Sequence, residues 1–362
     1  MHWETCAGHL LDGDRSLGAT TAVAVVGLGY WGPNLVRVLA ERTDVRVRWV
    51  CDLDPGRLAV IARRYPAVGV TGELDVVLAD PEVEAVLLAT PVFTHHELAR
   101  RCLEAGKHTF VEKPLAPSSE LAGDLIELAT ERGLVLMCGH TFLYSPPVRA
   151  VRGLIEGGQL GELFFVSSSR VNLGLHQRDV SVIWDLGPHD FSILLYWLEE
   201  LPRSIRAIGR ASIVPGIADV AFVTMEFESG LVASVELSWL APSKLRRTVV
   251  VGSRQMVVYE DGAPEPIRIF DRGVVYKDPE TFGEYHLSYR AGDIRSPHLS
   301  NDEPLSLQLS DFVHAVSTGQ GDPRGLMLAR DVVGLVEAAE VSLREGGTPV
   351  ALEGNRVTSG AG

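Results

Sequence analysis

The chain has 362 residues, which exceeds the size of most single hydrophobic cores and favours two domains. Hydrophobic residues make up 46% of it and are spread along its whole length, so a sizeable core can form and extensive disorder is not expected. The formal net charge of -14 disfavours nucleic acid and anionic membranes as partners, because phosphate backbones are bound by clustered Lys and Arg. An anionic substrate would therefore have to be bound by local cations.

The cysteines form no C-x-x-C pair, and two of them lie in apolar runs typical of strands. We therefore expect buried, reduced thiols at Cys6, Cys51, Cys102 and Cys138. No group of side chains has metal-ligand spacing, so no metal is expected. No apolar stretch is long enough to cross a bilayer, and the N-terminus lacks a basic segment followed by an apolar one. These patterns predict a cytoplasmic protein.

The first half of the chain alternates short β-branched runs with helical patterns, which predicts a doubly wound α/β domain over residues 21–143. Residues 1–20 precede it without a sustained period and are expected to form a flexible extension. Runs such as 22–26 are apolar throughout, as in parallel strands buried on both faces. The expected strands are 22–26, 45–51, 84–89, 107–111 and 134–138, and the expected helices are 32–42, 55–65, 94–105 and 118–132.

After residue 144 strands follow strands, which predicts an α+β domain over 144–352 with a large, mainly antiparallel sheet. Residues 233, 235, 237 and 239 are apolar and alternate with mostly polar neighbours, so the two faces of that sheet should differ. A long loop is expected at 278–303 and a flexible tail at 353–362. The expected strands are 161–171, 203–214, 218–228, 231–239, 246–251 and 254–260, and the expected helices are 147–157, 305–318 and 324–345.

A glycine motif connects the first predicted strand to the first predicted helix. In it, Gly27 permits the tight turn, Gly29 lets a pyrophosphate approach the backbone, and Gly32 allows close helix packing. The helix N-terminus then faces the anion, and Tyr30 and Trp31 complete the turn. The motif predicts a dinucleotide site, and a glycine turn that binds no nucleotide is the structural alternative.

Asp52 follows the second predicted strand, twenty positions beyond Gly32, where a carboxylate can bind the adenine-ribose diol. This favours NAD over NADP as the cofactor. Arg57 lies just beyond and could instead pair with the 2′-phosphate of NADP, so the choice of cofactor stays open at this point.

Two more segments follow predicted strands at the carboxyl edge of the sheet, where open α/β folds bind ligands. Thr90 and Pro91 should line the cofactor crevice, and His95 opens the next helix. His96 adjoins it, but adjacent helical residues point in different directions, so the pair cannot bind one metal. A surface or helix-start role is the alternative for both histidines.

Glu112-Lys113-Pro114 ends the fifth predicted strand, so the lysine can project into the crevice that holds the nicotinamide. Pro114 restricts Lys113 toward extended conformations, which would hold the side chain in one direction. Glu112 lies at the same edge and is counted with the cofactor site. A solvated surface charge is the alternative for the lysine.

Asp185 and His189 are four residues apart at the start of an apolar helix, so they share one face, and Pro188 is expected in the first turn. A neutral imidazole there can accept a substrate proton, while the carboxylate and the nearby lysine set its charge balance. Its pKa is expected near 6.5 unless Asp185 raises it. The alternative is that Asp185 caps the helix and His189 is a buried, satisfied histidine.

Together, the glycine motif, E-K-P and D-L-G-P-H resemble the Gfo/Idh/MocA family of sugar and inositol oxidoreductases, over about residues 21–350. The resemblance implies an N-terminal Rossmann domain and a C-terminal domain whose open-faced sheet forms a homodimer or homotetramer interface. It also implies that Lys113, Asp185 and His189 surround substrate and nicotinamide as catalytic residues. The family helix continues H-x-x-D, whereas Asp190 follows His189 directly, so the downstream acid has no match.

Residues 170–174 and 180–190 resemble family members that act at C3 of nucleotide sugars. This implies NAD-dependent oxidation of a C3 hydroxyl to a ketone, for example of UDP-glucose in an aminosugar or aminohydroxybenzoate antibiotic pathway. The candidate substrate contacts are Lys113, Tyr144, Arg170, Asn172, Arg178, Trp184, Asp185 and His189.

Four alternatives stay open. Two are dehydrogenases of other substrates or directions, namely an NADPH-dependent C3 ketoreductase of deoxysugar biosynthesis and an inositol dehydrogenase. Two belong to other classes, namely a glycosidase that retains its NAD and a non-catalytic nucleotide sensor. A sensor would have no need for both Lys113 and His189.

Overall fold

The computed structural model describes residues 20–174, 180–276, 287–353 and 356–358. By its contacts the chain divides into two compact units. Unit 1 is built from the chain up to Glu112 together with Asp124–Cys138 and Gln308–Pro323, and unit 2 from Lys113–Gly123, Gly139–Leu307 and the chain from Arg324 onward. None of the helices in the described ranges is both long and apolar enough to cross a membrane.

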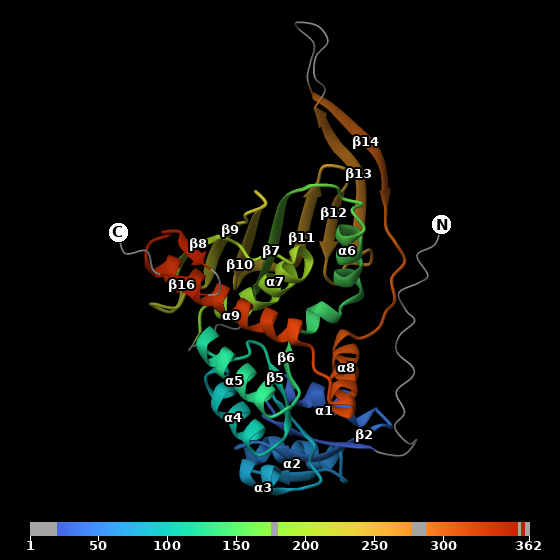
Figure 1. The fold of residues 1–362 in the computed structure, drawn as a ribbon, viewed down its shortest axis with the longest axis vertical. Coiled ribbons are helices and arrows are strands. Elements are labelled where there is room, and N and C mark those ends of the chain that lie inside the picture. Colours follow the sequence, from blue (N-terminus) through green and yellow to red (C-terminus); the bar gives the residue numbers. More distant parts are fainter. Residues whose placement is uncertain (1–19, 175–179, 277–286, 354–355, 359–362) are drawn as a thin grey trace, which may run out of the picture. The chain divides into compact units, whose positions relative to one another are not determined.

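The first sheet of the described chain is parallel, and helices cover it, which confirms the predicted doubly wound fold (Figure 1). Its strands are β1 (Thr21–Val26), β2 (Val45–Cys51), β3 (Gly69–Thr71), β4 (Ala85–Leu88), β5 (His108–Glu112) and β6 (Leu136–Gly139). The intervening helices are α1 (Gly32–Ala40), α2 (Pro55–Arg64), α3 (Leu74–Ala79), α4 (Val92–Glu104) and α5 (Ser119–Glu131).

These strands lie in the order β3-β2-β1-β4-β5-β6, and every residue of β1 is buried, as expected for a strand covered on both faces. The sequence pattern did not predict β3 or α3. With three and six residues they are too short to display a period.

The second sheet is mostly antiparallel, with the strand order β14-β13-β12-β11-β7-β10-β9-β8-β15-β16. Its strands are β7 (Leu163–Leu173), β8 (Ser204–Arg210), β9 (Val220–Glu226), β10 (Val232–Ser238), β11 (Leu240–Gly252), β12 (Met256–Glu260), β13 (Ile267–Tyr276), β14 (Leu287–Arg295), β15 (Val350–Glu353) and β16 (Arg356–Thr358). β7 and β10 pair in parallel, while β9–β10 and β7–β11 are antiparallel. The predicted α+β fold with a mainly antiparallel sheet is confirmed.

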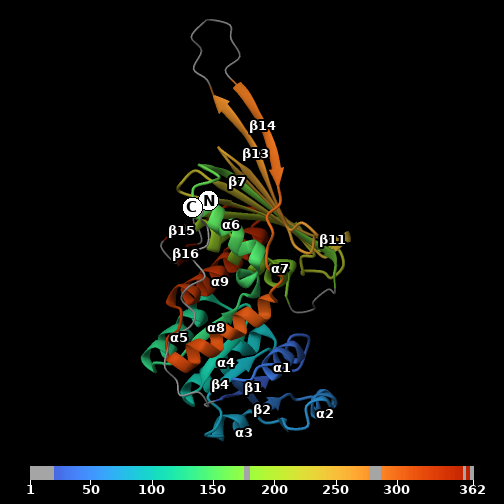
Figure 2. The ribbon, with the colours of Figure 1, turned by 90° about the vertical axis from the view of Figure 1, so that its right-hand side faces the viewer.

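The prediction of a long loop at 278–303 is wrong where β14 lies, and β13 was not predicted either. Residues 292–295 of β14 are all exposed, so this part of the strand lacks the apolar alternation by which a strand is recognised. Figures 1 and 2 show β13 and β14 extending as a hairpin beyond the neighbouring strands of the second sheet.

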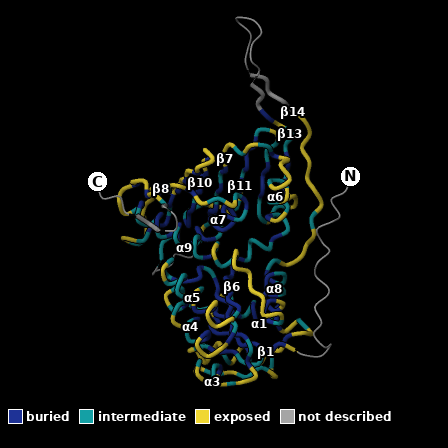
Figure 3. Tube along the Cα trace, viewed as in Figure 1, coloured by how far each residue is buried: buried dark blue, intermediate teal, exposed yellow. Residues whose placement is uncertain are grey.

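Helices pack on one face of the second sheet and leave the other face open (Figures 1 and 3). Unit 2 contains η1 (Thr141–Tyr144), α6 (Pro146–Glu156), α7 (Val182–Leu198) and most of α9 (Pro323–Arg344), while most of α8 (Pro304–Thr318) belongs to unit 1. On β10, Ala233, Val235 and Leu237 are buried as predicted. The open face instead exposes Phe165, Ile208, Phe222 and Val232.

Helix α7 begins earlier than the sequence pattern predicted. Ser181 caps it, with its Oγ accepting hydrogen bonds from the main-chain N–H groups of Ile183 (3.1 Å) and Trp184 (3.4 Å). Pro188 therefore lies inside the helix rather than in its first turn, as the sequence had suggested. A proline at that position removes one main-chain donor and distorts the ladder of helical hydrogen bonds around it.

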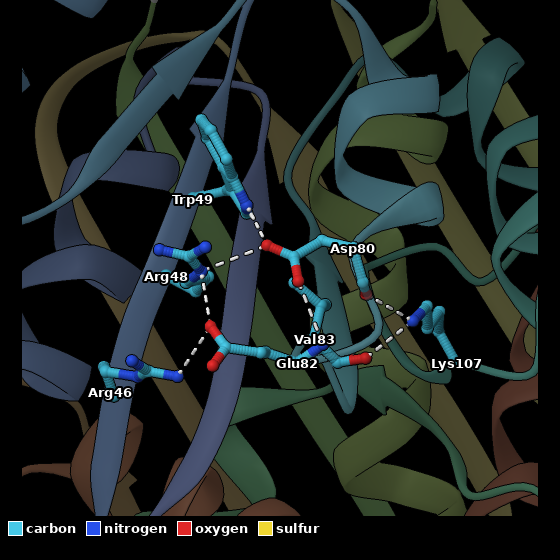
Figure 4. A network of polar contacts seen from close by, with 7 residues as sticks. All are labelled: Arg46, Arg48, Trp49, Asp80, Glu82, Val83 and Lys107. Atoms are coloured by element: carbon cyan, nitrogen blue, oxygen red, sulfur yellow. Dashed lines mark hydrogen bonds and ion pairs between the residues drawn. The ribbon is translucent and has the colours of Figure 1, made fainter.

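A polar network stabilises the loop that precedes β4 (Figure 4). Trp49 Nε1 and Arg48 Nε donate to one carboxylate oxygen of Asp80 at 2.7 and 3.0 Å. Lys107 is buried, and its Nζ donates to the main-chain oxygens of Asp80 (2.9 Å) and Val83 (2.8 Å). This network lies where β4 and β5 begin, so it stabilises the amino edge of the sheet and leaves the carboxyl edge to a ligand.

The expected buried thiols are confirmed for Cys51, Cys102 and Cys138, which are free and buried, whereas Cys6 lies outside the described residues. Burial raises the pKa of Cys51 to about 11 and that of Cys102 to about 12. Both thiols are therefore protonated at neutral pH.

Candidate active site

The turn between β1 and α1 is crowded at two glycines and open at the third. Gly27 has a φ of 89°, which favours glycine, and a Cβ there would lie 2.5 Å from the main-chain oxygen of Ala89. A Cβ on Gly32 would lie 2.0 Å from the main-chain oxygen of Gly27, so α1 starts directly against the turn. A Cβ on Gly29 would meet no atom within 4 Å, so the backbone there is open to a ligand.

The start of α1 offers main-chain donors to that ligand. Its N-cap residue, Trp31, makes no side-chain hydrogen bond to the first turn of the helix. A helix N-terminus attracts anions. In α1, Pro33 has no N–H group and the Asn34 N–H donates to the main-chain oxygen of Trp31 at 2.9 Å, which leaves the N–H groups before Pro33 to face an anion. Tyr30 beside it is 83% exposed and contacts the Trp31 ring at 5.5 Å. These residues fit the pyrophosphate of a dinucleotide.

Asp52 lies directly after β2, and both of its carboxylate oxygens bind main-chain N–H groups. Oδ2 accepts from Leu28 at 2.6 Å and Oδ1 from Asp54 at 2.8 Å. A carboxylate oxygen has a second lone pair, so a ribose hydroxyl can still bind. Arg57 lies 3.6 Å from Asp52 and also 3.6 Å from Asp54. The two predicted cofactor contacts therefore lie together, with the Arg57 charge shared between two carboxylates.

The segment after β4 is held from inside unit 1. His95 is almost fully buried, and its Nε2 lies 2.8 Å from the main-chain oxygen of Thr90. Thr94 Oγ1 also donates to Thr90 Oγ1 at 2.8 Å. The structure therefore places His95 where it supports the turn formed by Thr90 and Pro91. A cofactor contact by these three residues stays a prediction.

Lys113 follows β5, and its side chain is only 13% exposed. Its Nζ donates to the main-chain oxygen of Asp185 at 2.8 Å and lies 3.8 Å from Oδ1 of the same residue. Trp239 Nε1 donates to the other carboxylate oxygen, Oδ2, at 3.0 Å. Lys113 is therefore not a solvated surface charge, and the Asp185 carboxylate lies between an ammonium and an indole. Glu112, the last residue of β5, is buried.

His189 lies on α7, one turn beyond Asp185, and its imidazole is neutral at physiological pH. Desolvation lowers the pKa of His189 well below its usual value, and the charges of Lys113, Arg170 and Arg246 lower it further. The sequence-based expectation of a pKa near 6.5, or above it if Asp185 raised it, is not met. Lys113, Arg170 and Arg246 disfavour a positive charge on the imidazole, so the ring stays neutral. A neutral ring nitrogen is free to accept a proton for the duration of the reaction.

Arg170 on β7 and Asp190 on α7 form a buried ion pair next to His189. Arg170 Nε donates to Asp190 Oδ2, and both side chains are at most 5% exposed. Ser168 Oγ donates to Asp190 Oδ1 at 2.7 Å and also lies 2.9 Å from Thr248 Oγ1. The acid next to His189 is therefore engaged in the core. Removing one partner of such a pair leaves an uncompensated charge, which costs about 3–5 kcal/mol.

Several buried polar atoms near these residues have no hydrogen-bond partner in the part of the chain that the structure describes. They are Nδ1 and Nε2 of His140, Nη1 of Arg170 and Oδ1 of Asn172. Burial and the charge of Lys113 lower the pKa of His140 to about 3, so its ring offers one donor and one acceptor. Asn172 adjoins Trp239, because a Cβ on Gly174 would contact both.

The remaining predicted substrate contacts are less closely grouped. The ring of Tyr144 lies 4.8 Å from the guanidinium carbon of Arg149. Trp184 is half-buried in the first turn of α7. Arg178 lies outside the described residues. Substrate binding by these residues stays a prediction.

Sequence reasoning missed four residues of this group, and for two of them a signal existed. His140 directly follows β6, at the same kind of strand end that pointed to Lys113. Trp239 continues the inward alternation of β10, so its burial was predicted although its bond to Asp185 was not. Phe142 and Arg246 had no such signal, because only the folded chain brings them to His189.

This arrangement is suited to proton transfer at a hydroxyl group. A neutral imidazole can accept the proton, and the ammonium of Lys113 can stabilise the negative charge that develops on the oxygen. Within the described ranges, no group of three or more His, Cys, Asp or Glu side chains could hold a metal ion.

Two family models match the chain. The model described as an oxidoreductase family with an NAD-binding Rossmann fold matches residues 21–140, and the GFO/IDH/MocA C-terminal domain matches residues 148–258. These matches cover the glycine turn, Lys113, Asp185 and His189.

Known proteins resemble the chain along much of its length. UDP-N-acetylglucosamine 3-dehydrogenase of Acidithiobacillus ferrooxidans is 30% identical over 62% of this chain and 68% of its own. 2,7-Anhydro-N-acetylneuraminate hydratase of Escherichia coli is 29% identical over 59% of this chain, and the alignment spans 60% of the hydratase. The structure of GenD2 from gentamicin A biosynthesis, in complex with NAD, matches with a TM-score of 0.79 and 26% identity, covering 95% of this chain and 100% of GenD2.

The matched models and relatives agree with the fold and with the family resemblance inferred from the sequence. The chain therefore belongs to the Gfo/Idh/MocA family of oxidoreductases, and it is an enzyme of the dehydrogenase type that acts on CH–OH groups.

Proposed function

We propose that this protein uses NAD to oxidise a secondary hydroxyl of a sugar, at C3 of a nucleotide sugar such as UDP-glucose, to a ketone. The observation that carries the proposal is the group formed by Lys113, Asp185 and His189. In it the Lys113 ammonium is held by Asp185, and its charge helps to keep the His189 imidazole neutral. A protein that only senses a nucleotide needs neither group.

Each residue of the group has a distinct role in this reaction. Bound NAD supplies the hydride acceptor, and the glycine turn and Asp52 would hold it. His189 takes the hydroxyl proton because its ring is neutral. Lys113 stabilises the charge that develops on the substrate oxygen. Asp185, bonded to Trp239, keeps Nζ of Lys113 in place.

The buried polar atoms around the group support a polyhydroxylated substrate. A buried polar group without a partner costs about 1–3 kcal/mol, so sugar hydroxyls that donate to and accept from His140, Arg170 and Asn172 would remove this cost. The similarity to a UDP-N-acetylglucosamine 3-dehydrogenase supports a nucleotide sugar oxidised at C3. The similarity to GenD2 supports a role in antibiotic biosynthesis.

A second candidate is chemistry without net oxidation. A hydratase adds water, so the similarity to 2,7-anhydro-N-acetylneuraminate hydratase favours a reaction on a sugar in which no reduced cofactor accumulates. The same Lys113 and His189 would serve, because proton transfer at a sugar carbon or oxygen is needed in either reaction. Accumulation of reduced cofactor separates the two candidates.

The open face of the second sheet supports a homo-oligomer. Phe165, Ile208, Phe222 and Val232 are each 41–54% exposed on β7 to β10 and form two cross-strand pairs, Phe165 with Val232 and Ile208 with Phe222. Exposed apolar patches rimmed by polar residues mark protein interfaces. We infer a dimer or tetramer that packs these faces together, and sedimentation velocity of the purified protein tests it.

The proposed function is tested by incubating the protein with NAD and a panel of UDP-glucose, UDP-N-acetylglucosamine and free inositols. We expect absorbance of reduced cofactor with a nucleotide sugar and a 3-keto product by mass spectrometry. Consumption of sugar without reduced cofactor would instead establish the second candidate. Reduction by inositols alone would replace the nucleotide sugar as substrate.

Replacing Lys113 should impair chemistry rather than cofactor binding. We expect Lys113→Ala to lower kcat by about 10² or more while the Kd for NAD, measured by calorimetry, changes little. Lys244→Ala, at an exposed position on β11, is the matched control and should keep normal turnover. Near-normal turnover in Lys113→Ala would remove the lysine from the mechanism.

The pH dependence of oxidation should report the lowered pKa of His189. A base must be neutral to work, so the activity falls only when the pH drops through that pKa, well below 6.5. Arg246→Gln removes one of the cations that lower the pKa, so the acidic midpoint should move up toward 6.5. Arg203→Gln, in an exposed pair with Glu226, should leave it unchanged. A midpoint near 6.5 in the wild-type enzyme would contradict this assignment.

Two glycine variants should separate cofactor binding from folding. In Gly29→Ala the new methyl group meets no protein atom, so the Tm should stay unchanged while NAD binding weakens by about tenfold or more because the pyrophosphate is blocked. Gly32→Ala would place a methyl group against the main-chain oxygen of Gly27, so its Tm should fall.

With Asp52 intact, NADP should bind more weakly than NAD. Equal binding of the two cofactors would make Arg57 a phosphate contact.

A further inference from the structure

The imidazole of His189 lacks the usual means of orientation. A catalytic histidine is commonly held by a hydrogen bond from one ring nitrogen to a carboxylate or a main-chain oxygen. In the described part of the chain no hydrogen bond reaches the His189 ring, and the helix carboxylates are engaged elsewhere. Asp185 binds Trp239, and Asp190 binds Arg170.

The ring contact that His189 does make is with Phe142. Their centroids are 5.0 Å apart and their planes meet at 73°, so the rings pack edge to face. Phe142 belongs to η1, the short helix that follows β6 and His140. Edge-to-face pairs at this distance are attractive and favour one relative orientation.

Phe142 is itself held by two guanidinium groups. The guanidinium carbon of Arg170 lies 4.6 Å from its ring centroid and that of Arg246 lies 5.5 Å away, both within the range of a cation–π contact. Carboxylates anchor each arginine: Asp190 binds Arg170, and Asp261 Oδ2 accepts from Arg246 Nη1 at 2.8 Å. The benzene ring therefore cannot rotate or shift without breaking contacts with two anchored side chains.

We propose that Phe142 is the positioning residue of the His189 base. Its ring, fixed by Arg170 and Arg246, holds the imidazole so that a ring nitrogen faces the substrate hydroxyl. The expected effect on kcat rests on the proposed function, whereas the ring geometry does not depend on it.

The arrangement explains why Asp190 follows His189 directly. Asp190 compensates the buried Arg170, and Arg170 in turn fixes Phe142, so the acid acts on the base through two intermediates rather than on the substrate. The charged and titratable groups around the imidazole are Lys113, His140, Arg170, Arg246, Asp185 and Asp190.

The kinetic test compares two substitutions at the same position. Phe142→Leu removes the ring but keeps an apolar side chain, so kcat should fall by about 10- to 100-fold, as expected for a misplaced base, while the KM for NAD stays constant. Phe142→Tyr keeps the ring and should retain kcat within about threefold. Phe227→Leu, which removes a buried ring elsewhere in unit 2, is the control and should keep normal kcat.

The structural test needs no substrate. In protein labelled with ¹⁵N-histidine, the His189 ring signals are assigned by their loss in His189→Asn and are followed with pH. In Phe142→Leu the pKa of His189 should rise toward 6.5, because water enters where the ring was, while Phe142→Tyr and Phe227→Leu should match the wild type.

Wild-type kcat and an unchanged His189 titration in Phe142→Leu would overturn the proposal. An equal loss of kcat in Phe227→Leu would also overturn it, because the effect would then come from general loosening of unit 2. If the His189 titration shifts as expected while the enzyme oxidises none of the tested sugars, the positioning role stands and the proposed function fails.

Discussion

The hydrogen bond from Nζ of Lys113 to the main-chain oxygen of Asp185 is the contact on which the site depends. It joins the segment after β5 to α7, so two parts of the chain that are 72 residues apart present their functional groups together. Pro188 lies three residues beyond that oxygen and lacks an N–H group. The N–H group missing at Pro188 would have bonded to the main-chain oxygen of Trp184, so the helix is distorted next to the Asp185 oxygen that the lysine binds.

This contact also determines how charge is distributed among Lys113, Asp185 and His189. Asp185 accepts from Trp239 on one oxygen and faces the ammonium with the other, so its charge compensates Lys113 and leaves the imidazole alone. His189 is then buried and surrounded by cations without an acid of its own, so desolvation first, and these charges second, lower its pKa. The ordinary carboxylate–histidine pair is replaced here by a carboxylate–lysine pair and an aromatic contact.

The sequence was enough to predict the fold and the placement of its motifs, because both depend on local patterns along the chain. Continuous apolar runs predicted β1 and β4, and a chain alternating between strands and helices must place Gly27, Asp52 and Thr90 at one edge of a parallel sheet. The failures have equally local causes. Pro188 was expected in a first turn because proline is tolerated there, whereas the helix already begins at Val182, after the Ser181 cap. Phe142 and Arg246 reach His189 only through tertiary packing, which no spacing along the chain encodes.

The paired charges also bear on which part of a nucleotide sugar this group of residues fits. A chain with a net charge of -14 needs local cations to bind a diphosphate. Arg170 and Arg246 are neutralised by Asp190 and Asp261, so they tune the base and fix Phe142 rather than attract an anion. What they leave around His189 is a set of buried donors and acceptors with unused capacity. Such a set matches neutral sugar hydroxyls, and if the substrate is the proposed nucleotide sugar, its diphosphate would be bound by residues outside this group.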